Sequence, residues 1–316
     1  MKFSLGEDRV EFAAQVRRAL EDGCTPKDVR AAWDGDLDRG VWQTLVDMGT
    51  TDPELDWVTR VAVAEEIGRA ALPHPWVETA FVVGPILGDD LGAQLASTDL
   101  GTEGQTLGSQ GLIPAGADAD VLVLRWPRGL VVADPAQVAM EPVETVDGAR
   151  RMVCRGEVRD IRDDQFRETE VQLAGALGTA AVLVGLGQHL LDTTVAYVSE
   201  REQFGQPVGG FQAVKHHLAD AAKDLAFARP VVHRAAYRLH TDDPAAAVDV
   251  STAKALASDA ASLTAEVALQ CHGAIGYTIE YDLHLWLKRV WALSRAWGDA
   301  THHRALVADA LGLHAG

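Results

Sequence analysis

The spacing of apolar residues divides the chain into three regions. Up to about residue 96, apolar side chains recur every three or four positions, which predicts amphipathic helices over Val10–Leu20, Val41–Met48 and Trp57–Ile67. Between residues 97 and 164 the pattern changes to short runs rich in Val and Leu, bounded by Gly, Pro and Asp, such as "DVLVLRW", "GLVVAD" and "RRMVCRGEVRDI". Such runs are typical of strands, and we expect about four or five of them in one small sheet.

From residue 165 to the end the pattern is helical again, in long segments joined by short turns. Helices of this length that follow one another closely pack as an antiparallel four-helix bundle. Pro230 should kink the second of them near Ala228 or Arg229. The predicted bundle helices are Gln165–Glu200, Phe211–His240, Pro244–His272 and Leu283–Leu311.

The expected fold is therefore mainly α with a small β domain. We expect an N-terminal helical domain over residues 1–96, a shortened middle β domain over 97–164 and a C-terminal four-helix bundle over 165–316. The longest apolar stretch, Leu173–Leu191, contains four glycines and ends in charged helix, so we expect a buried core helix and no membrane span. The amphipathic, acidic N-terminus has no cleavage signal, which favours a cytoplasmic protein.

Composition narrows the class of ligand. The 316 residues include 47% hydrophobic and 23% charged residues, which fits a folded chain with a sizeable core. Its 28 Lys and Arg against 46 Asp and Glu give a net charge of -18, which argues against binding to nucleic acid. A few local arginines can still bind a small anion. The isolated Cys24, Cys154 and Cys271 offer neither a disulfide framework nor a metal-binding pair, and we expect no metal.

Two loops of the bundle carry candidate chemistry. Between the first two bundle helices, "SEREQFGQPVGGFQ" places the cation Arg201 beside the amides of Gln203 and Gln212 and the aromatic Phe204. An ordinary helix-to-helix connection could have the same composition, and the spacing alone leaves both interpretations open. Between the third and fourth helices, "ALQCHGAIGYTIEYDLHLWLKR" combines closely spaced glycines, which let backbone amides approach a ligand, with one carboxylate, Glu280.

These two motifs, in this order on one bundle, resemble the FAD-binding loops of the acyl-CoA dehydrogenase family. The resemblance implies that Arg201 binds the FAD pyrophosphate, since a guanidinium meets phosphate oxygens in a bidentate manner. It implies that Phe204 and Gln212 contact the adenine end. In the family these loops reach across an interface to FAD held mainly by a neighbouring subunit. The expected FAD-binding residues are Arg201, Gln203, Phe204, Gln212, Gln270, Gly273 and Ala274.

The resemblance also implies the reaction. Glu280 aligns with the base that removes the α-proton of an acyl-CoA substrate while the β-hydrogen leaves as hydride to the flavin. An apolar pocket makes a carboxylate a stronger base. An electron-transfer flavoprotein is the expected electron acceptor. On its own, Glu280 could equally be a glutamate near a helix N-terminus, where it favours the helix dipole.

Two departures affect the expected site. Ala274 replaces the second glycine of the second loop, which leaves less room at that amide. Further on, "RAWGDATHHR" replaces the family's Glu-Gly-Thr turn, with Gly298 kept and Asp299 at the threonine position. Asp299 therefore either brings an anion near the cofactor, as a rival to Glu280, or directs the turn elsewhere.

The middle region departs most. The family's Thr-Glu-Pro-Gly and Trp-Ile-Thr type segments, which contact the flavin, are missing between Ser97 and Asp164. The chain thereby resembles the shortened subunit of heteromeric (α2β2) acyl-CoA dehydrogenases, whose partner is a longer homologous subunit. Several such pairs act on bulky polycyclic thioesters, including steroid side chains. The alternatives are a non-catalytic subunit that braces a full-length dehydrogenase, and a flavin enzyme of the same fold with a non-CoA substrate.

Overall fold

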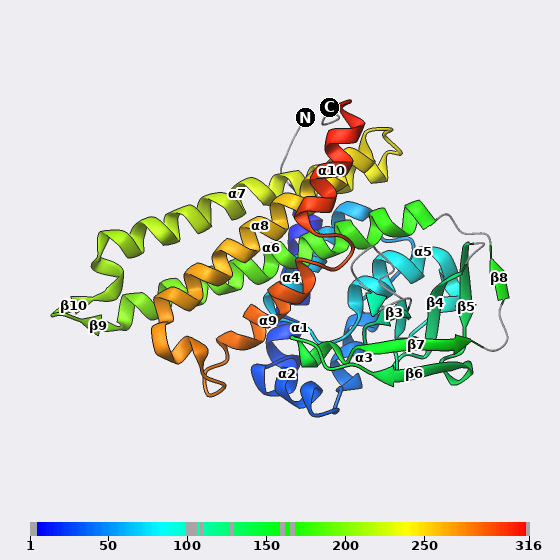
Figure 1. Ribbon diagram of the computed structural model, residues 1–316, viewed down its shortest axis with the longest axis horizontal. Coiled ribbons are helices and arrows are strands. Elements are labelled where there is room, and N and C mark those ends of the chain that lie inside the picture. The colour runs from blue at the N-terminus through cyan, green and yellow to red at the C-terminus, as the bar shows by residue number, and fades with distance from the viewer. Residues whose placement is uncertain are drawn as a thin grey trace.

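Helices form both ends of the chain and strands form its middle, in the order that the apolar pattern predicts (Figure 1). The computed structural model describes residues 5–98, 106–107, 110–126, 129–158, 162–164 and 168–313. Aspartates begin two of the N-terminal helices: Asp38 accepts a hydrogen bond from Gly40 N, and Asp56 accepts bonds from the amides of the first turn of its helix. The N-terminal elements are α1 (Glu7–Gly23), α2 (Pro26–Trp33), α3 (Arg39–Asp47), α4 (Trp57–Arg69), the π-helical turn Glu78–Val83 and α5 (Gly84–Leu87).

The middle region contains more strands than the sequence indicated. The described residues form two four-stranded sheets, in the orders β1-β4-β5-β8 and β2-β3-β7-β6, where one sheet of about four or five strands was predicted. Within the first, β1 runs parallel to β4 and the other pairs are antiparallel. The strands are β1 (Ala96–Thr98), β2 (Thr106–Leu107), β3 (Gln110–Ile113), β4 (Val121–Trp126), β5 (Gly129–Ala133), β6 (Val138–Pro142), β7 (Val153–Val158) and β8 (Arg162–Asp164).

The strands that the sequence did not reveal are mostly edge strands. The runs recognised by pattern became β4, β5 and β7, which each have two neighbours. The edge strands β1, β2, β6 and β8 have one neighbour each, and β8 consists of the polar residues Arg162–Asp164. An edge strand does not need an apolar run, because it pairs with a neighbouring strand along only one of its two hydrogen-bonding edges.

The C-terminal region is a helix bundle, as predicted, with one break. The helix α7 continues through Pro230. The predicted fourth helix is two helices, because the backbone turns at Trp297 and Gly298, whose φ angles are +57° and +92°. The bundle elements are α6 (Glu168–Glu200), α7 (Gln212–His240), α8 (Ala246–His272), α9 (Leu283–Leu293) and α10 (Ala300–Ala310).

The helix α6 forms the centre of the molecule. Within the part of the chain that the structure describes, Thr169–Glu200 is long and apolar enough to cross a membrane, but 83% of its apolar window is buried inside the protein. This confirms the prediction of a core helix. A Cβ atom on Gly185 would lie 1.9 Å from the carbonyl oxygen of Glu65 in α4, and one on Gly68 would lie 2.1 Å from that of Val182. The glycines therefore allow the backbones of α4 and α6 to touch.

One buried arginine joins the three regions. Arg289 of α9 donates through Nε to the carboxylate of Asp147, which lies between the strands β6 and β7, and through Nη1 to the carbonyl of Leu72, 2.5 Å away. All three groups are shielded from water, so the contacts fix α9 against both other regions. These contacts of α9 also anchor the C-terminal end of the preceding loop, and that loop carries Glu280.

Candidate functional site

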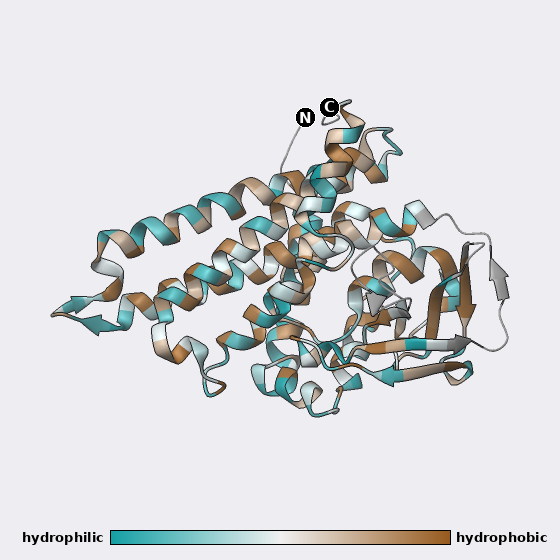
Figure 2. Cartoon of the chain, viewed as in Figure 1, coloured by the Kyte–Doolittle hydropathy of each residue, from teal (hydrophilic) through white to brown (hydrophobic). Residues whose placement is uncertain are grey.

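The first predicted loop is a short hairpin at one end of the bundle. The strands β9 (Glu202–Gln203) and β10 (Gln206–Pro207) pair antiparallel, and the hairpin is the outermost part of that end in Figure 1. Phe204 and Gly205, at its turn, both have positive φ angles, +54° and +80°, as a two-residue hairpin turn requires. Figure 2 shows that the hairpin strands are hydrophilic. The hairpin therefore projects its side chains away from the core.

The predicted cofactor residues of this loop are exposed to solvent. The ring of Phe204 is 93% exposed and lies edge to face with Phe211, with 6.2 Å between ring centroids. Among the described residues, the Arg201 guanidinium has neither a hydrogen bond nor an ion pair. The amides of Gln203 and Gln212 have only local partners, the Glu202 carbonyl and His216. An unpaired cation beside a free aromatic face is suited to a phosphate-bearing aromatic ligand.

The second predicted loop follows α8 at the same end of the bundle (Figure 1). Gly273 ends α8 with φ of +63°, and a Cβ atom on it would meet nothing within 4 Å. The glycine therefore provides the backbone turn, with no close approach inside the chain. Gln270 and Ala274 are exposed, so the side of the loop they occupy is open to a ligand or another chain. The turn continues as a short 3-10 helix, Gly273–Tyr277.

Three aromatic rings bring the two loops together. Tyr197 of α6 stacks on His272 of α8, with 4.3 Å between ring centroids and 19° between ring planes. Tyr281, which precedes α9, lies 5.2 Å from His272 and 6.2 Å from Tyr197. The structure thus places Arg201, Gly273 and Glu280 on segments that meet at one ring cluster. The cluster could not be inferred from the spacing, because Tyr197 lies far along the chain from His272 and Tyr281.

Glu280 lies in a solvent-exposed turn between this short helix and α9. Its neighbours Tyr277 and Ile279 are 74% and 72% exposed. A general base is strengthened when its carboxylate is shielded from water. In this chain that shielding is absent at Glu280, and it would have to come from a partner that covers the exposed apolar side chains.

The contacts of Asp299 make it a poor candidate for the base. Its carboxylate accepts a hydrogen bond from His302 N at 2.8 Å and so caps α10. That bond, helped by Lys254, holds the pKa of the Asp299 carboxyl below its usual range, which makes it a weaker proton acceptor. Trp297, which stands where the family turn has glutamate, is 1% exposed. A Cβ atom on Gly175 of α6 would lie 2.3 Å from its indole ring.

A buried lysine holds this turn, and sequence reasoning did not single it out. Lys254 Nζ donates to the carbonyls of Gly298 and Ser294, at 2.9 and 3.1 Å, and to Ser258 Oγ at 3.0 Å. Burial lowers the pKa of Lys254 to about 7. The available signal was one lysine in the alanine-rich stretch "STAKALASDAA". A polar residue at a core position of a helix indicates a buried polar contact.

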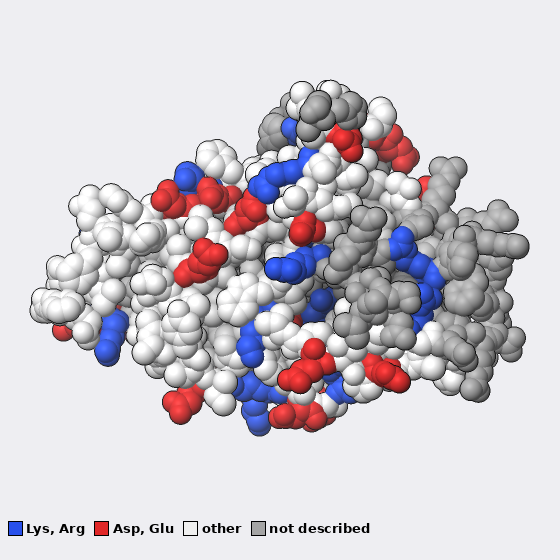
Figure 3. Space-filling model, in the orientation of Figure 1, with Lys and Arg blue, Asp and Glu red and all other residues white. Residues whose placement is uncertain are grey.

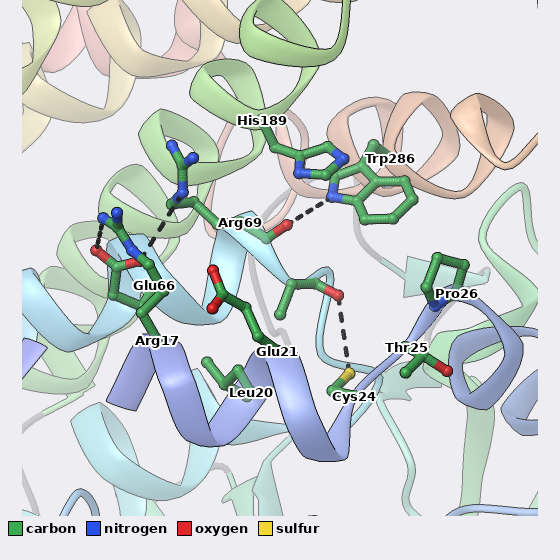
Figure 4. A pocket seen from close by; sticks show the side chains of 11 residues that line it. Arg17, Leu20, Glu21, Cys24, Thr25, Pro26, Glu66, Arg69, His189 and Trp286 are labelled. Atoms are coloured by element: carbon green, nitrogen blue, oxygen red, sulfur yellow. Dashed lines mark hydrogen bonds and ion pairs between the residues drawn. The ribbon is translucent and has the colours of Figure 1, made fainter. Parts of the chain in front are cut away.

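A cavity of about 270 Å³ lies elsewhere, between α1, α4, α6 and α9 (Figure 4). Its walls include the stacked rings of His189 and Trp286, whose centroids are 4.0 Å apart. Both of its arginines are paired within the chain, Arg17 with Glu66 and Arg69 with Asp192. None of the residues predicted for FAD or proton transfer lines it. On the face drawn in Figure 3, acidic and basic side chains are interspersed and no broad basic patch is seen.

Comparison with known proteins places this bundle in a family. The family model described as "Acyl-CoA dehydrogenase, C-terminal domain" matches residues 173–312, which include all of the predicted site residues. The chain is 31% identical over 315 residues to "Acyl-CoA dehydrogenase IpdE2" of Mycobacterium tuberculosis, with 90% of this chain and 91% of that protein covered. The chain belongs to the acyl-CoA dehydrogenase family. The resemblance inferred from the two loop motifs is thereby confirmed.

Solved structures of acyl-CoA dehydrogenases share the whole fold. A chain of the ChsE4-ChsE5 complex from Mycobacterium tuberculosis superposes with a TM-score of 0.85 at 22% identity and covers 100% of both chains. A chain of the "Tcur3481-Tcur3483 steroid ACAD G363A variant" superposes with a TM-score of 0.85 at 22% identity, over 98% of this chain and 99% of that one. At this identity the likeness establishes the arrangement of helices and sheets, and it confirms the predicted fold class.

Proposed function

We propose that this chain is one subunit of a heteromeric, FAD-dependent acyl-CoA dehydrogenase that forms the α,β double bond of an acyl-CoA thioester. The proposal rests first on family membership and then on the two exposed loops. Its partner is a longer homologous subunit, and an electron-transfer flavoprotein removes the electrons. The cytoplasm is the expected location of such an enzyme.

The observation that carries the proposal is the exposed Arg201, whose guanidinium has no hydrogen bond or ion pair among the described residues, on the same hairpin as the exposed ring of Phe204. An isolated chain gains no stability from a free cation and a 93% exposed phenylalanine with a positive φ angle. Both features suit a ligand or subunit that arrives from outside. Together with the amides of Gln203, Gln212 and Gln270, they fit a dinucleotide that offers a diphosphate, hydroxyl groups and an aromatic base.

The proposed reaction needs residues of two kinds, those that bind FAD and one that accepts the α-proton. Arg201 would neutralise the FAD diphosphate, Phe204 would pack at its adenine end, and Gln270, Gly273 and Ala274 would meet it from the second loop. When bound, FAD takes up the hydride from the substrate's β-carbon. The proton on the α-carbon needs a carboxylate at a dry site, and the exposed Glu280 and the capping Asp299 do not meet that requirement within this chain.

We therefore assign the base to the partner subunit and the diphosphate contacts to this chain. A second candidate keeps Glu280 as the base. It is favoured by the exposed side chains of Tyr277 and Ile279, since a partner that covers them would also remove water from Glu280. Both candidates keep the same overall reaction. They differ in which chain accepts the proton.

The names of the structural neighbours support a heteromer and a bulky substrate. One neighbour is a complex of two differently named chains, and another is named a steroid acyl-CoA dehydrogenase. We propose a steroid-derived or similarly bulky acyl-CoA thioester as the substrate. The shortened middle region and the exposed loops are both compatible with a site that two unlike chains complete.

Anaerobic flavin bleaching tests the proposal. The chain is co-expressed with its longer homologue, and the purified complex is mixed with steroid-side-chain and straight-chain acyl-CoA thioesters. Loss of the flavin's visible absorbance with formation of the enoyl-CoA is the expected result. Absence of bleaching with every thioester would contradict the proposed reaction.

The Glu280→Gln variant separates the two candidates. Glutamine keeps the shape of the side chain and cannot accept the proton. If the partner supplies the base, the variant complex should bleach within about threefold of the wild-type rate. Loss of a general base costs about 10² to 10⁴ in rate. A fall of that size, with FAD and substrate still bound, would assign the base to Glu280.

A further inference from the structure

The ring cluster of Tyr197, His272 and Tyr281 joins the segments that carry the proposed cofactor contacts. Arg201 N donates to the Tyr197 carbonyl at 2.9 Å, so this ring lies one helical turn before the proposed diphosphate ligand. His272 is the last residue of α8, where the second loop begins. Tyr281 directly follows Glu280. Tyr197 therefore stands at the base of the hairpin, and His272 and Tyr281 stand at the two ends of the second loop.

His272 makes the two closest ring contacts of the cluster. It is 4% exposed, stacks on Tyr197 at 4.3 Å and meets Tyr281 at 5.2 Å, whereas the two tyrosines are 6.2 Å apart. Ring pairs at these separations attract one another beyond the area they bury. The closest ring contacts between the Arg201 hairpin and the Glu280 turn therefore run through His272.

The hydrogen bonds of His272 specify its form. Nδ1 lies 2.8 Å from the Ala268 carbonyl oxygen, which can only accept, so Nδ1 carries the proton. Among the described residues Nε2 is buried without a hydrogen-bond partner. Burial also lowers the pKa of His272, which keeps the ring neutral. The hydrogen bond from Nδ1 and the ring contacts therefore hold the side chain, and Nε2 has no polar partner among the described residues.

We propose that His272 is a positioning residue that keeps the Arg201 hairpin and the Glu280 turn in one mutual arrangement through its ring contacts with Tyr197 and Tyr281. The ligand class is that of the proposed function, on which this inference rests: a dinucleotide that touches both loops at once. A ligand that bridges two loops binds tightly only if their separation is set beforehand. His272 supplies that preorganisation without touching the ligand.

Two substitutions distinguish the ring contacts from the imidazole chemistry. His272→Phe keeps an aromatic ring and removes both ring nitrogens, the unpartnered Nε2 and the Nδ1 that donates to the Ala268 carbonyl, so it should preserve the arrangement if the ring contacts set it. His272→Ala removes both ring contacts. His240→Ala, at the exposed far end of α7, is the matched histidine control. Hydrogen exchange is measured on amides 202–211 and 273–281 in the complex without FAD, and FAD affinity is measured in the same complexes.

We expect His272→Ala to raise exchange about tenfold in both segments and to weaken FAD binding about tenfold, while the bleaching rate at saturating FAD stays near wild type. His272→Phe and His240→Ala should match wild type in each measurement. Faster exchange confined to 273–281, no change in either segment, or equal loosening in the Phe variant would each overturn the proposal. If the wild-type complex binds no FAD, the proposed function fails, and the exchange measurements still decide the role of His272.

Discussion

Replacing Arg201 with alanine removes the one cation that the hairpin offers to the proposed diphosphate. Its side chain is exposed and unpaired within the described residues, so the substitution breaks no intrachain contact. Surface changes of this kind alter the free energy of unfolding by about 0.5 kcal/mol or less. The folded state of the chain should therefore be unaffected, and any change in FAD affinity reflects the lost contact between Arg201 and FAD.

The expected loss of FAD binding follows from the type of contact. A hydrogen bond to a charged group contributes about 1.5–3 kcal/mol, and a guanidinium can make two to a diphosphate. Because the partner completes the site and leaves it partly accessible to water, we take about 2–4 kcal/mol for the two hydrogen bonds together. That range corresponds to an increase of roughly 30-fold to 10³-fold in the Kd for FAD.

The assay is a titration of FAD into the deflavinated complex, followed by flavin fluorescence, with melting curves recorded in parallel. Arg201→Lys keeps the charge and loses the bidentate geometry, so it should fall between wild type and Arg201→Ala. Arg304→Ala, which removes an exposed arginine from α10, is the control for net charge. An unchanged Kd in Arg201→Ala would show that the hairpin is only a helix connector.

The remaining predictions concern stability. Burial lowers the pKa of His303 to about 4 from 6.5, so its contribution is complete above pH 6.5 and is lost as the pH falls toward 4. His303→Gln should reduce the change in urea-unfolding stability across that window by about 3 kcal/mol, and a pH dependence equal to that of wild type would refute the assignment. Gly185→Ala should lower stability by about 3 kcal/mol or more in the same assay, because its Cβ atom would meet the Glu65 carbonyl oxygen at 1.9 Å. A neutral Gly185→Ala would mean that α4 and α6 can move apart.

Much of the fold could be predicted because its helices and central strands repeat apolar residues at their own periods. The pattern failed where local chemistry outweighs periodicity. Edge strands such as β8, with the polar residues Arg162–Asp164, have no apolar run to recognise. The break between α9 and α10 depends on positive φ angles at Trp297 and Gly298 and on a buried lysine 43 or more positions earlier in the chain. Contacts that span such distances leave little trace in the local spacing.

The site was predicted unevenly for the same reason. The motifs around Arg201 and Gly273 are local, so their residue types and turns could be read from short stretches. The ring cluster of Tyr197, His272 and Tyr281 forms only when the end of α6 meets the end of α8 and the turn before α9, which local spacing does not show. The surroundings of Glu280 also depend on packing, and the structure places that carboxylate in solvent. The motifs identified the Arg201 hairpin and the loop after α8, and the structure showed what surrounds them.

The number of flavins per chain decides whether this chain holds FAD alone or only together with its partner. The chain is purified alone and as the co-expressed complex with its longer homologue, and FAD is quantified against protein by absorbance and native mass spectrometry. The account predicts little or no FAD on the isolated chain and about one FAD for each pair of unlike chains in the complex. One tightly bound FAD on every copy of the isolated chain would contradict it.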